Sequence, residues 1–446
     1  MTNAPSIKRT QAEEALIAQF DAGNVFAGDA ADVVAARRDA FDRLRESGLP
    51  HRRVEAYKYT DLRKLMRSAP PIAGPMDAGQ LAAAIAAAKP ETADLNPTVM
   101  AIANGEVVSG LDNQWPAGLT LSRLADILTG GSAVIEQLPA IEEFAADPLV
   151  ELNTAFMSDG VIAQVGVDAQ IAQPIELLHL ADGTESARYV RHKISVGPGA
   201  SITLIDRHLG PADCAYHANS VIELHVGAGA NVRLIRLQEE GNAALHFSSI
   251  AIRLDEKAIL NQFTLTTGAA VSRAQTFCHL AGSNADAAIR GATLIGHRQH
   301  ADMTINVDHA VGDCQSHELF KTVVDDEARA VFQGRIGVRQ YADGSDGRMM
   351  SNALLLSEGS EIITKPELEI FADDVQCAHG ATSGELDDDL MFYLRSRGLP
   401  ERQARQLLIT AFIAQAIEEI GDEDIEAVIK TRAEGWLSER AQSHDN

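Results

Sequence analysis

The 446-residue sequence contains only four cysteines, which lie far apart at positions 214, 278, 314 and 377. No two of them form a CxxC pair, so we expect neither a disulfide framework nor a zinc-binding module. We expect the protein to act in the cytoplasm, where thiols stay reduced, because the chain also lacks the apolar segments described next.

Long apolar segments are also missing. The longest nearly apolar stretch, LLITAFIAQAI (407–417), is interrupted by Thr and Gln and falls short of the roughly 18–20 residues that a membrane span needs. The first twenty residues have no apolar core of signal-peptide length, so we expect no secretory leader.

Positive charge is scarce. The chain has 38 Lys and Arg residues against 63 Asp and Glu residues, which gives a formal net charge of -25. Such a surface repels phosphate backbones and anionic lipids, so we expect neither nucleic acid nor a membrane as a partner. A protein with a basic patch is a better candidate for a binding partner.

Several catalytic and nucleotide-binding motifs are absent from the sequence. It contains no GxxxxGK[ST], no HExxH, no GxSxG and no strand–GxGxxG–helix unit, so the chain is not itself a P-loop ATPase. Paired glycines such as Gly197 and Gly199 precede stretches typical of strands, which favours turns over phosphate-binding loops.

The first 150 residues predict a region of helices and loops. Thr10 is followed by acidic residues, as expected of an N-cap. Gly48 and Pro50 are stop signals for a second helix, and Pro90 is expected to end an alanine-rich third helix.

A repeat dominates the middle of the chain. The segments 165–171, 196–202 and 226–232 share the pattern V-G-x-[D/G]-A-x-[I/V], and 254–260 fits it loosely. Their alanines, Ala169, Ala200, Ala230 and Ala258, recur at nearly equal intervals along the chain. A Gly-containing turn followed by alternating apolar residues predicts one short strand per unit. A fixed period of about 30 residues without helices predicts a β-solenoid over 151–380, whereas a β-sandwich, the alternative, gives no reason for such a period.

After Gly384 the pattern returns to helix and predicts a C-terminal helical domain (381–446) of three helices. The middle helix begins near Pro400, ends at Gly421 and is apolar on nearly every side between Leu407 and Ile417. Such a helix must be covered either by its own domain or by another protein, and the sequence leaves both open.

Histidines are frequent, with eleven between His179 and His317. A metal site is conceivable where five donors fall in a short span, at His297, His300, His309, Cys314 and His317. No two of these have a tight ligand spacing on an evident helix, so we favour ordinary surface or strand positions.

Cys377 and His379 raise a sharper question. The preceding LEIFADDV predicts a strand, and on an extended segment residues i and i+2 share a face. A thiolate and an imidazole are two donors, whereas iron or zinc in a tetrahedral site takes about four. The pair is therefore either half of a site completed elsewhere, by the histidines or by a second protein, or an ordinary cysteine beside an incidental histidine.

Two long blocks resemble the SufB/SufD family, the scaffold proteins of SUF iron–sulfur cluster assembly. They are HAVGDCQSHELFKTVVDDEARAVFQGRIGV (309–338) and residues 352–412. The resemblance is to the SufD branch, because Gly380, not Glu, follows His379, and because the segment Glu55–Thr60 is similar to E-x-W-[K/R]-Y-T with Tyr57 in place of Trp.

The resemblance implies a right-handed parallel β-helix between helical ends. It also implies partners: SufB, which pairs through the β-helix, and the SufC ATPase, which binds the C-terminal helices and supplies the nucleotide chemistry. We expect the SufC contact at Tyr393, Arg395, Arg397, Leu408 and Phe412. A homodimer through the same β-helix edge is a further expectation.

By the same resemblance, Cys377 and His379 lie at the SufB interface, where His379, and less directly Cys377, helps to hold a transient iron–sulfur cluster. The chain is then a non-catalytic subunit. Two alternatives stay open: a stand-alone β-helix lyase or esterase acting on carbohydrate, and an ATPase adaptor without a metal role.

Overall fold

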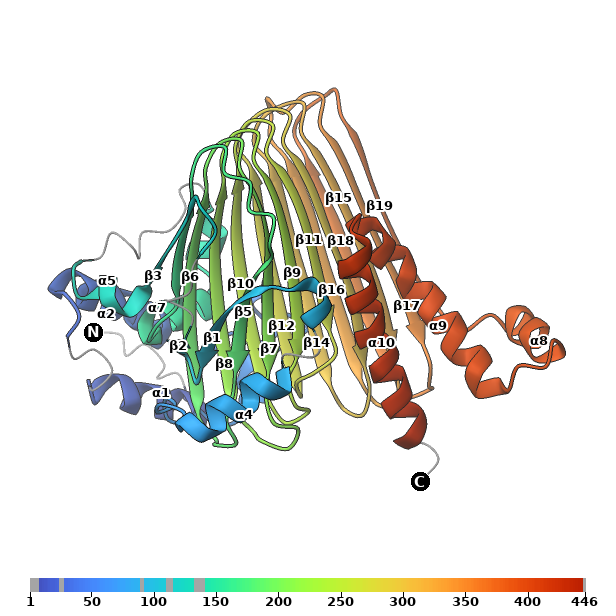
Figure 1. Cartoon of the computed structure of the whole chain (residues 1–446), viewed down its shortest axis with the longest axis horizontal. Coiled ribbons are helices and arrows are strands. Elements are labelled where there is room, and N and C mark those ends of the chain that lie inside the picture. Colours follow the sequence, from blue (N-terminus) through green and yellow to red (C-terminus); the bar gives the residue numbers. More distant parts are fainter. Residues whose placement is uncertain (1–7, 24–27, 89–91, 110–114, 132–140, 444–446) are drawn as a thin grey trace.

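The computed structural model describes residues 8–23, 28–88, 92–109, 115–131 and 141–443. Pro90, the expected stop signal of the third helix, lies outside these ranges. The strands follow one another in sequence order, from helices at the N-terminal end to helices at the C-terminal end (Figure 1). The prediction of a mainly β solenoid with helical ends is confirmed.

The solenoid consists of two facing sheets, and each of its eight turns contributes one parallel strand to each sheet. The nine-stranded sheet contains β3 (Leu119–Arg123), β4 (Val161–Val165), β6 (Ala187–Val196), β8 (His217–Val226), β10 (Leu245–Leu254), β12 (Val271–Leu280), β14 (His300–His309), β16 (Arg329–Val338) and β18 (Glu361–Ile370). The ten-stranded sheet contains β1 (Thr98–Ala103), β2 (Glu106–Ser109), β5 (Ile175–Leu180), β7 (Ser201–Leu209), β9 (Asn231–Glu239), β11 (Ile259–Thr266), β13 (Asp286–Ile295), β15 (Gln315–Val324), β17 (Asp346–Leu355) and β19 (Gln376–Gly384).

The repeated sequence motif forms the tight turn between the two sheets. Gly199 and Gly229 have φ angles of +68° and +65° at equivalent turn positions, where a glycine avoids the strain of a side chain. The alanines that follow them, Ala200 and Ala230, are buried in the core between the sheets. The motif therefore repeats because each turn needs a left-handed residue and then a small inward-facing one.

The prediction of one short strand per repeat was wrong. Each turn holds two strands, and most of them are eight to ten residues long. Strand β8 is almost completely buried because one face packs in the core and the other under the flanking layer. A strand buried on both faces shows no alternation of apolar and polar residues, so the alternation pattern could not reveal it.

The description of residues 1–150 as helices and loops was also wrong, because β1, β2 and β3 join the sheets. Strand β1 pairs in parallel with β5, a contact that only the tertiary structure creates. A local signal was present: Asn104 and Gly105, both with positive φ, connect β1 to β2 as an Asn-Gly hairpin turn does.

N-terminal helices cover the outer face of the nine-stranded sheet. They are α1 (Gln11–Asp21), α2 (Ala31–Ser47), η2 (Glu55–Tyr57), α3 (Leu62–Leu65), α5 (Leu124–Leu128), α6 (Glu142–Ala145) and α7 (Pro148–Phe156). The Thr10 cap and the Gly48 stop are confirmed, since Thr10 forms a capping box with Glu13. On the ten-stranded sheet lie α4 (Ala78–Ala88) and η4 (Ala93–Leu95).

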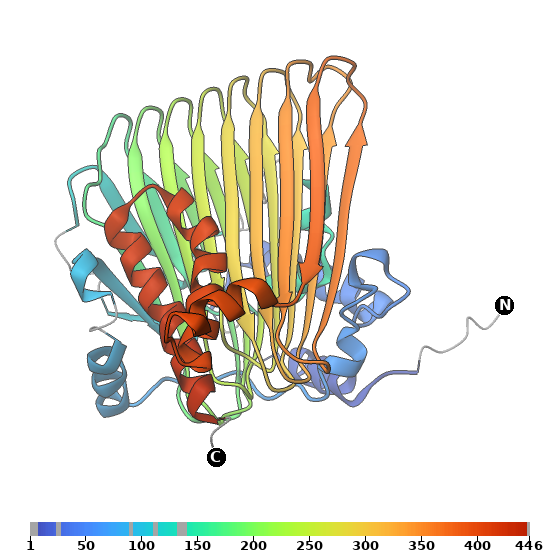
Figure 2. The same cartoon turned by 90° about the vertical axis from the view of Figure 1, so that its right-hand side faces the viewer.

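C-terminal helices cover the outer face of the ten-stranded sheet (Figure 2). They are α9 (Glu401–Ile417), η6 (Glu418–Ile420) and α10 (Glu423–Ser443), whereas α8 (Asp388–Ser396) has no buried residue. Ile409, Ile413 and Ile417 of α9 are buried against this sheet and α10, so the chain itself covers most of this apolar helix. Within the described ranges, no helix is long and apolar enough to cross a membrane.

The expected domain limits at 150/151 and 380/381 fall inside α7 and β19, respectively. Strand β19, which carries Cys377 and His379, continues to Gly384. The division into the ranges 1–150, 151–380 and 381–446 stays a prediction about domain organisation.

Candidate functional site

The C-terminal end of the solenoid is open. Strands β18 and β19 are the last strands of the two sheets, and each pairs with a described strand on one side only. The other side of each strand presents main-chain groups that can pair with another chain. This end is therefore a ready surface for strand-mediated association.

The two edge strands differ in chemistry. Strand β18 (EIITKPELEI) carries four charged residues and Pro366, features that discourage strand pairing. Strand β19 (QCAHGATSG) has neither proline nor Asp, Glu, Lys or Arg, and most of it is exposed. The less protected of the two edges is the one that carries Cys377 and His379.

Cys377 and His379 share a face, as their spacing predicted. Cys377 pairs in register with Gly347 of β17 and packs at the end of the solenoid core, while His379 pairs with the core residue Met349. Cys377 is half-buried and His379 exposed. A Cβ atom at Gly347 would lie 3.6 Å from Cys377 Sγ, an ordinary van der Waals contact, so the sulfur packs beside this glycine.

The local strand prediction needs one correction. LEIFADDV spans the end of β18 and the following turn, so the pair lies on the next strand. Burial raises the pKa of the Cys377 thiol, which keeps it protonated at neutral pH. Among the described residues, no group of three close donors includes Cys377 or His379.

A buried carboxyl group lies behind this end. Glu318 of β15 shares a face with the core residue Phe320 and is only 2% exposed. Burial raises its pKa to about 8. Besides burial, the negative charge of ionised Glu318 also raises the pKa of the Cys377 and Cys278 thiols. Titratable groups therefore extend from the open end into the core.

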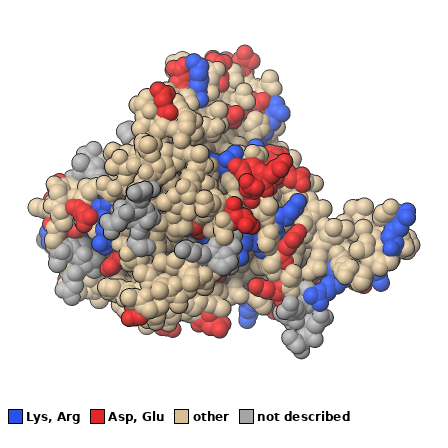
Figure 3. Space-filling view, in the orientation of Figure 1, with Lys and Arg blue, Asp and Glu red and all other residues tan. Residues whose placement is uncertain are grey.

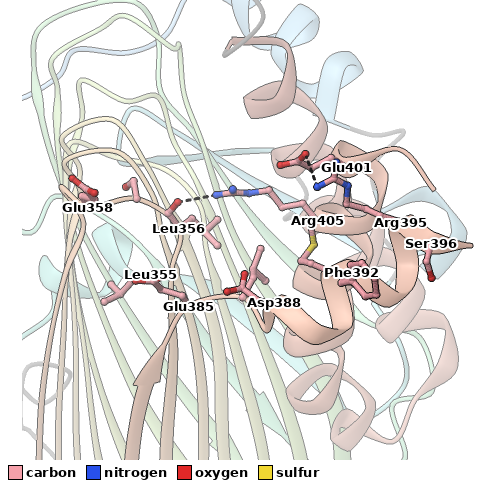
Figure 4. Close-up of a pocket in the computed structure, with 13 residues that line it drawn as sticks. Leu355, Leu356, Glu358, Glu385, Asp388, Phe392, Arg395, Ser396, Glu401 and Arg405 are labelled. Carbon is pink, nitrogen blue, oxygen red and sulfur yellow. Dashed lines mark hydrogen bonds and ion pairs between the residues drawn. The ribbon is translucent and has the colours of Figure 1, made fainter. Parts of the chain in front are cut away.

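A second accessible feature is the projecting helix α8, which has no buried residue (Figure 1). Between α8, α9 and the end of β17 lies a cavity of about 830 Å³ (Figure 4). Arg405 donates from Nη2 to the carbonyl oxygen of Leu356 across it (2.8 Å), and Arg395 pairs with Glu401 at 3.3 Å. Acidic side chains gather near the turn from α9 to α10, and basic ones near the tip of α8 (Figure 3).

The five residues expected to contact the ATPase separate into two groups. Tyr393, Arg395 and Arg397 are exposed on or just after α8, and the Arg397 guanidinium carbon lies 5.2 Å from the centre of the Tyr393 ring. Leu408 is half-buried. Phe412 packs toward the solenoid, with Lys321 Nζ 4.8 Å from its ring centre. Phe412 thus has an intramolecular role.

The exposed apolar residues of this region were missed. Leu390, Phe392 and Leu407 are 50%, 74% and 51% exposed, which is unusual for such large side chains. The signal was present in the DDDLMFYLRSRG sequence, whose apolar residues exceed what one short helix can bury. They give α8 and α9 an exposed apolar surface.

The histidines between 297 and 317 point in different directions. His297 lies at an exposed turn, and His300 contacts Thr60 at the N-terminal helices with 3.0 Å between Nε2 and Oγ1. His309 lies inside the solenoid, with Nε2 3.0 Å from Ser316 Oγ. The real concentration of histidines was missed: His179, His192, His208 and His246 gather inside the opposite end of the solenoid.

These features define a parallel β-solenoid protein with helical ends, an open strand edge and a projecting apolar helix. Residues 179–412 match the family model described as "SUF system FeS cluster assembly, SufBD core domain", and residues 10–177 match "SufBD protein N-terminal region". The chain therefore belongs to the SufBD family of SUF iron–sulfur cluster assembly proteins.

Individual relatives agree with this assignment. The chain is 31% identical over 399 residues to the iron–sulfur cluster assembly protein SufD of Escherichia coli, covering 87% of this chain and 90% of the relative. It is 28% identical over 432 residues to an iron–sulfur cluster assembly SufBD family protein of Synechocystis, covering 93% of each. The similarity to SufD thus extends over most of both chains.

Proposed function

We propose that the chain is a non-catalytic, cytoplasmic subunit of a SUF-type assembly complex. Its open β19 edge pairs with SufB, and α8 with the start of α9 binds the SufC ATPase. Cys377 and His379 contribute ligands to a nascent iron–sulfur cluster at the SufB interface. In the absence of SufB, the same edge can pair with a second copy of the chain.

The observation that carries this proposal is the position of the two donors. Cys377 and His379 share a face of the one edge strand that lacks charge and proline. Two donors need a complement, and an unpaired strand edge brings a second protein directly beside them. The geometry thus supports a site divided between two chains.

The chemistry of the pair suits a transient product. The protonated Cys377 thiol is a weak ligand by itself, and iron binding replaces the proton and creates the thiolate. His379 is exposed, so it can reach an incoming cluster. A cluster held by few ligands from each chain can be passed on, as an assembly intermediate must be.

The contact with SufC rests on a separate observation. Phe392 and Tyr393 expose large apolar surface on a helix that projects from the body of the protein. Aromatic residues of this kind supply the core of many protein interfaces, with arginines such as Arg395 and Arg397 beside them.

The test is to co-express the chain with SufB and SufC, purify the complex anaerobically and measure subunit stoichiometry, iron and sulfide. We expect His379→Ala to reduce cluster content several-fold without loss of a subunit, and Cys377→Ser to have a smaller effect. His297→Ala, which removes an exposed histidine far from β19, is the control. Full cluster content in both interface variants would contradict the proposed metal role of Cys377 and His379. The chain would then act only as an adaptor that binds the ATPase.

A further inference from the structure

The end of the solenoid opposite β19 contains a second set of metal-ligand side chains. His179 of β5 and His208 of β7 are partners in register on neighbouring parallel strands, so their rings stack with 4.1 Å between centres. Asp206 precedes His208 by two residues and therefore faces the same side. All three are buried.

The donor atoms of these residues converge. His179 Nε2 lies 3.1 Å from Asp206 Oδ1, and His208 Nε2 lies 3.1 Å from both oxygens of Asp206. In a tetrahedral site with metal–nitrogen and metal–oxygen bonds of about 2.0 Å, neighbouring ligand atoms are about 3.3 Å apart. The spacing in the protein is already close to that of a coordination shell.

Hydrogen bonding does not account for all of these contacts. His179 Nε2 is buried and close to Asp206, yet it is not aligned for a hydrogen bond with any described group. Arg236 donates from Nε to Asp206 Oδ2 at 3.0 Å, which leaves Oδ1 as the oxygen nearest to His179. A cation bound between them would take His179 Nε2 and Asp206 Oδ1 as two of its ligands.

A small cavity adjoins the imidazoles. Its volume is about 20 Å³, and His179, His208 and Glu240 are among its lining residues. A space of this size holds about one water molecule. Two imidazoles, one carboxylate and a water make four ligands, the set found in many zinc and iron sites.

Nearby residues surround this group, and two of them form a second donor group that shares His208. His192 accepts a hydrogen bond at Nδ1 from the Val161 amide (3.0 Å), so its proton lies on Nε2 and it is not a ligand. His246 and Glu240 form this second group with His208, and His246 Nδ1 lies 2.8 Å from Glu240 Oε2. Gln238 already donates to the same Oε2 at 2.8 Å, so this oxygen is less available to a cation than Asp206 Oδ1. The hydrogen bond from Arg236 Nε to Asp206 Oδ2 fixes the orientation of the carboxylate.

We propose that His179, Asp206 and His208 bind one divalent transition-metal ion, such as Fe²⁺ or Zn²⁺, inside the solenoid. The site is independent of the proposed cluster interface. Seven strand spacings of about 4.8 Å separate β5 from β19, so the two lie roughly 34 Å apart. Because the ligands are buried, the ion enters as the chain folds and then stabilises the N-terminal turns.

Anaerobic titration with Co²⁺ tests the proposal, because cobalt bound by imidazole and carboxylate absorbs visible light. The full chain carrying Cys377→Ser and His379→Ala is used, so that the interface donors cannot contribute. After refolding with cobalt, we expect one ion per chain, displaced by Zn²⁺. Failure to bind a stoichiometric ion would overturn the proposal.

Variants locate the ion. His179→Gln and Asp206→Asn should each weaken binding at least tenfold. His225→Gln is the matched control, because His225 forms a similar pair with Asp255 (2.8 Å) at the half-exposed surface, without a third donor. Equal affinity in His179→Gln and the parent, or equal loss in His225→Gln, would overturn the assignment. If Asp206→Asn does not fold, as judged by circular dichroism, His179→Gln decides.

Discussion

The ring of Tyr57 lies under the guanidinium group of Arg273, with 4.1 Å between the guanidinium carbon and the ring centre. Arg273 Nη2 also donates to the Ala56 carbonyl oxygen at 2.9 Å, and the Tyr57 hydroxyl donates to Asp147 Oδ2 at 2.8 Å. The segment whose sequence resembles the SufD branch thus attaches the N-terminal helices to the solenoid.

We expect Tyr57→Phe to lower the free energy of unfolding by about 1–3 kcal/mol, because it removes a buried hydrogen bond and leaves Asp147 with one partner fewer. Urea denaturation measures the change. Tyr341→Phe, at a ring that is 83% exposed, should change stability by less than about 0.5 kcal/mol. Equal stability of the Tyr57 variant and the wild type would contradict the role of the Tyr57 hydroxyl in attaching the N-terminal helices to the solenoid.

The edge of β19 predicts the effect of an added charge. Ala378 is exposed between Cys377 and His379, and Ala378→Lys places an ammonium group on an edge that is otherwise free of charged side chains. We expect at least a tenfold loss of affinity for SufB in a pull-down or calorimetric titration. Val167→Lys, at a 67% exposed turn residue near the other end, should bind normally. Unchanged binding by Ala378→Lys would show that the interface lies elsewhere.

The exposed aromatic surface of α8 predicts a second binding defect. Phe392→Ala removes a ring that is 74% exposed in the isolated chain, and we expect a loss of SufC affinity of about tenfold or more without loss of stability. Tyr341→Ala removes an aromatic ring that is 83% exposed and lies outside this region, and it is the control. Normal SufC binding by Phe392→Ala would exclude α8 as the contact.

Glu318 predicts how stability depends on pH. Its folded pKa of about 8 lies above the ordinary value of 4.5, so the folded state retains a proton that the unfolded state loses between these values. The stability that this retained proton gives to the folded state is therefore complete below about pH 4.5. It is lost as the pH rises toward 8, at up to about 1.4 kcal/mol per pH unit.

Glu318→Gln keeps the shape of the side chain and removes its ionisable carboxyl group. We expect denaturation curves at pH 5.5, 7 and 8.5 to show a weaker loss of stability with rising pH than in the wild type. Glu327→Gln, at a side chain that is 67% exposed, should leave the slope unchanged. Identical slopes in Glu318→Gln and wild type would show that the buried carboxyl group does not titrate in this range.

The periodic part of the protein follows from local constraints that are visible in the amino-acid sequence. The turn motif has to recur once in every turn of the solenoid because each turn needs a left-handed residue followed by a small buried one, and that constraint is local. Helix ends at Thr10 and Gly48 were predictable for the same reason, since caps depend on neighbouring residues. The spacing of Cys377 and His379 likewise fixed their common face once the segment was extended.

Tertiary structure decided what depends on distant neighbours. Strand β1 joins the solenoid only through its pairing with β5, and β8 shows no alternation because both of its faces are covered. His179 and His208 become neighbours only when parallel strands align in register, although a full turn of the solenoid separates them along the chain. Local patterns record the conformation of a segment, whereas the edge that stays open and the side chains that meet inside depend on how the turns stack.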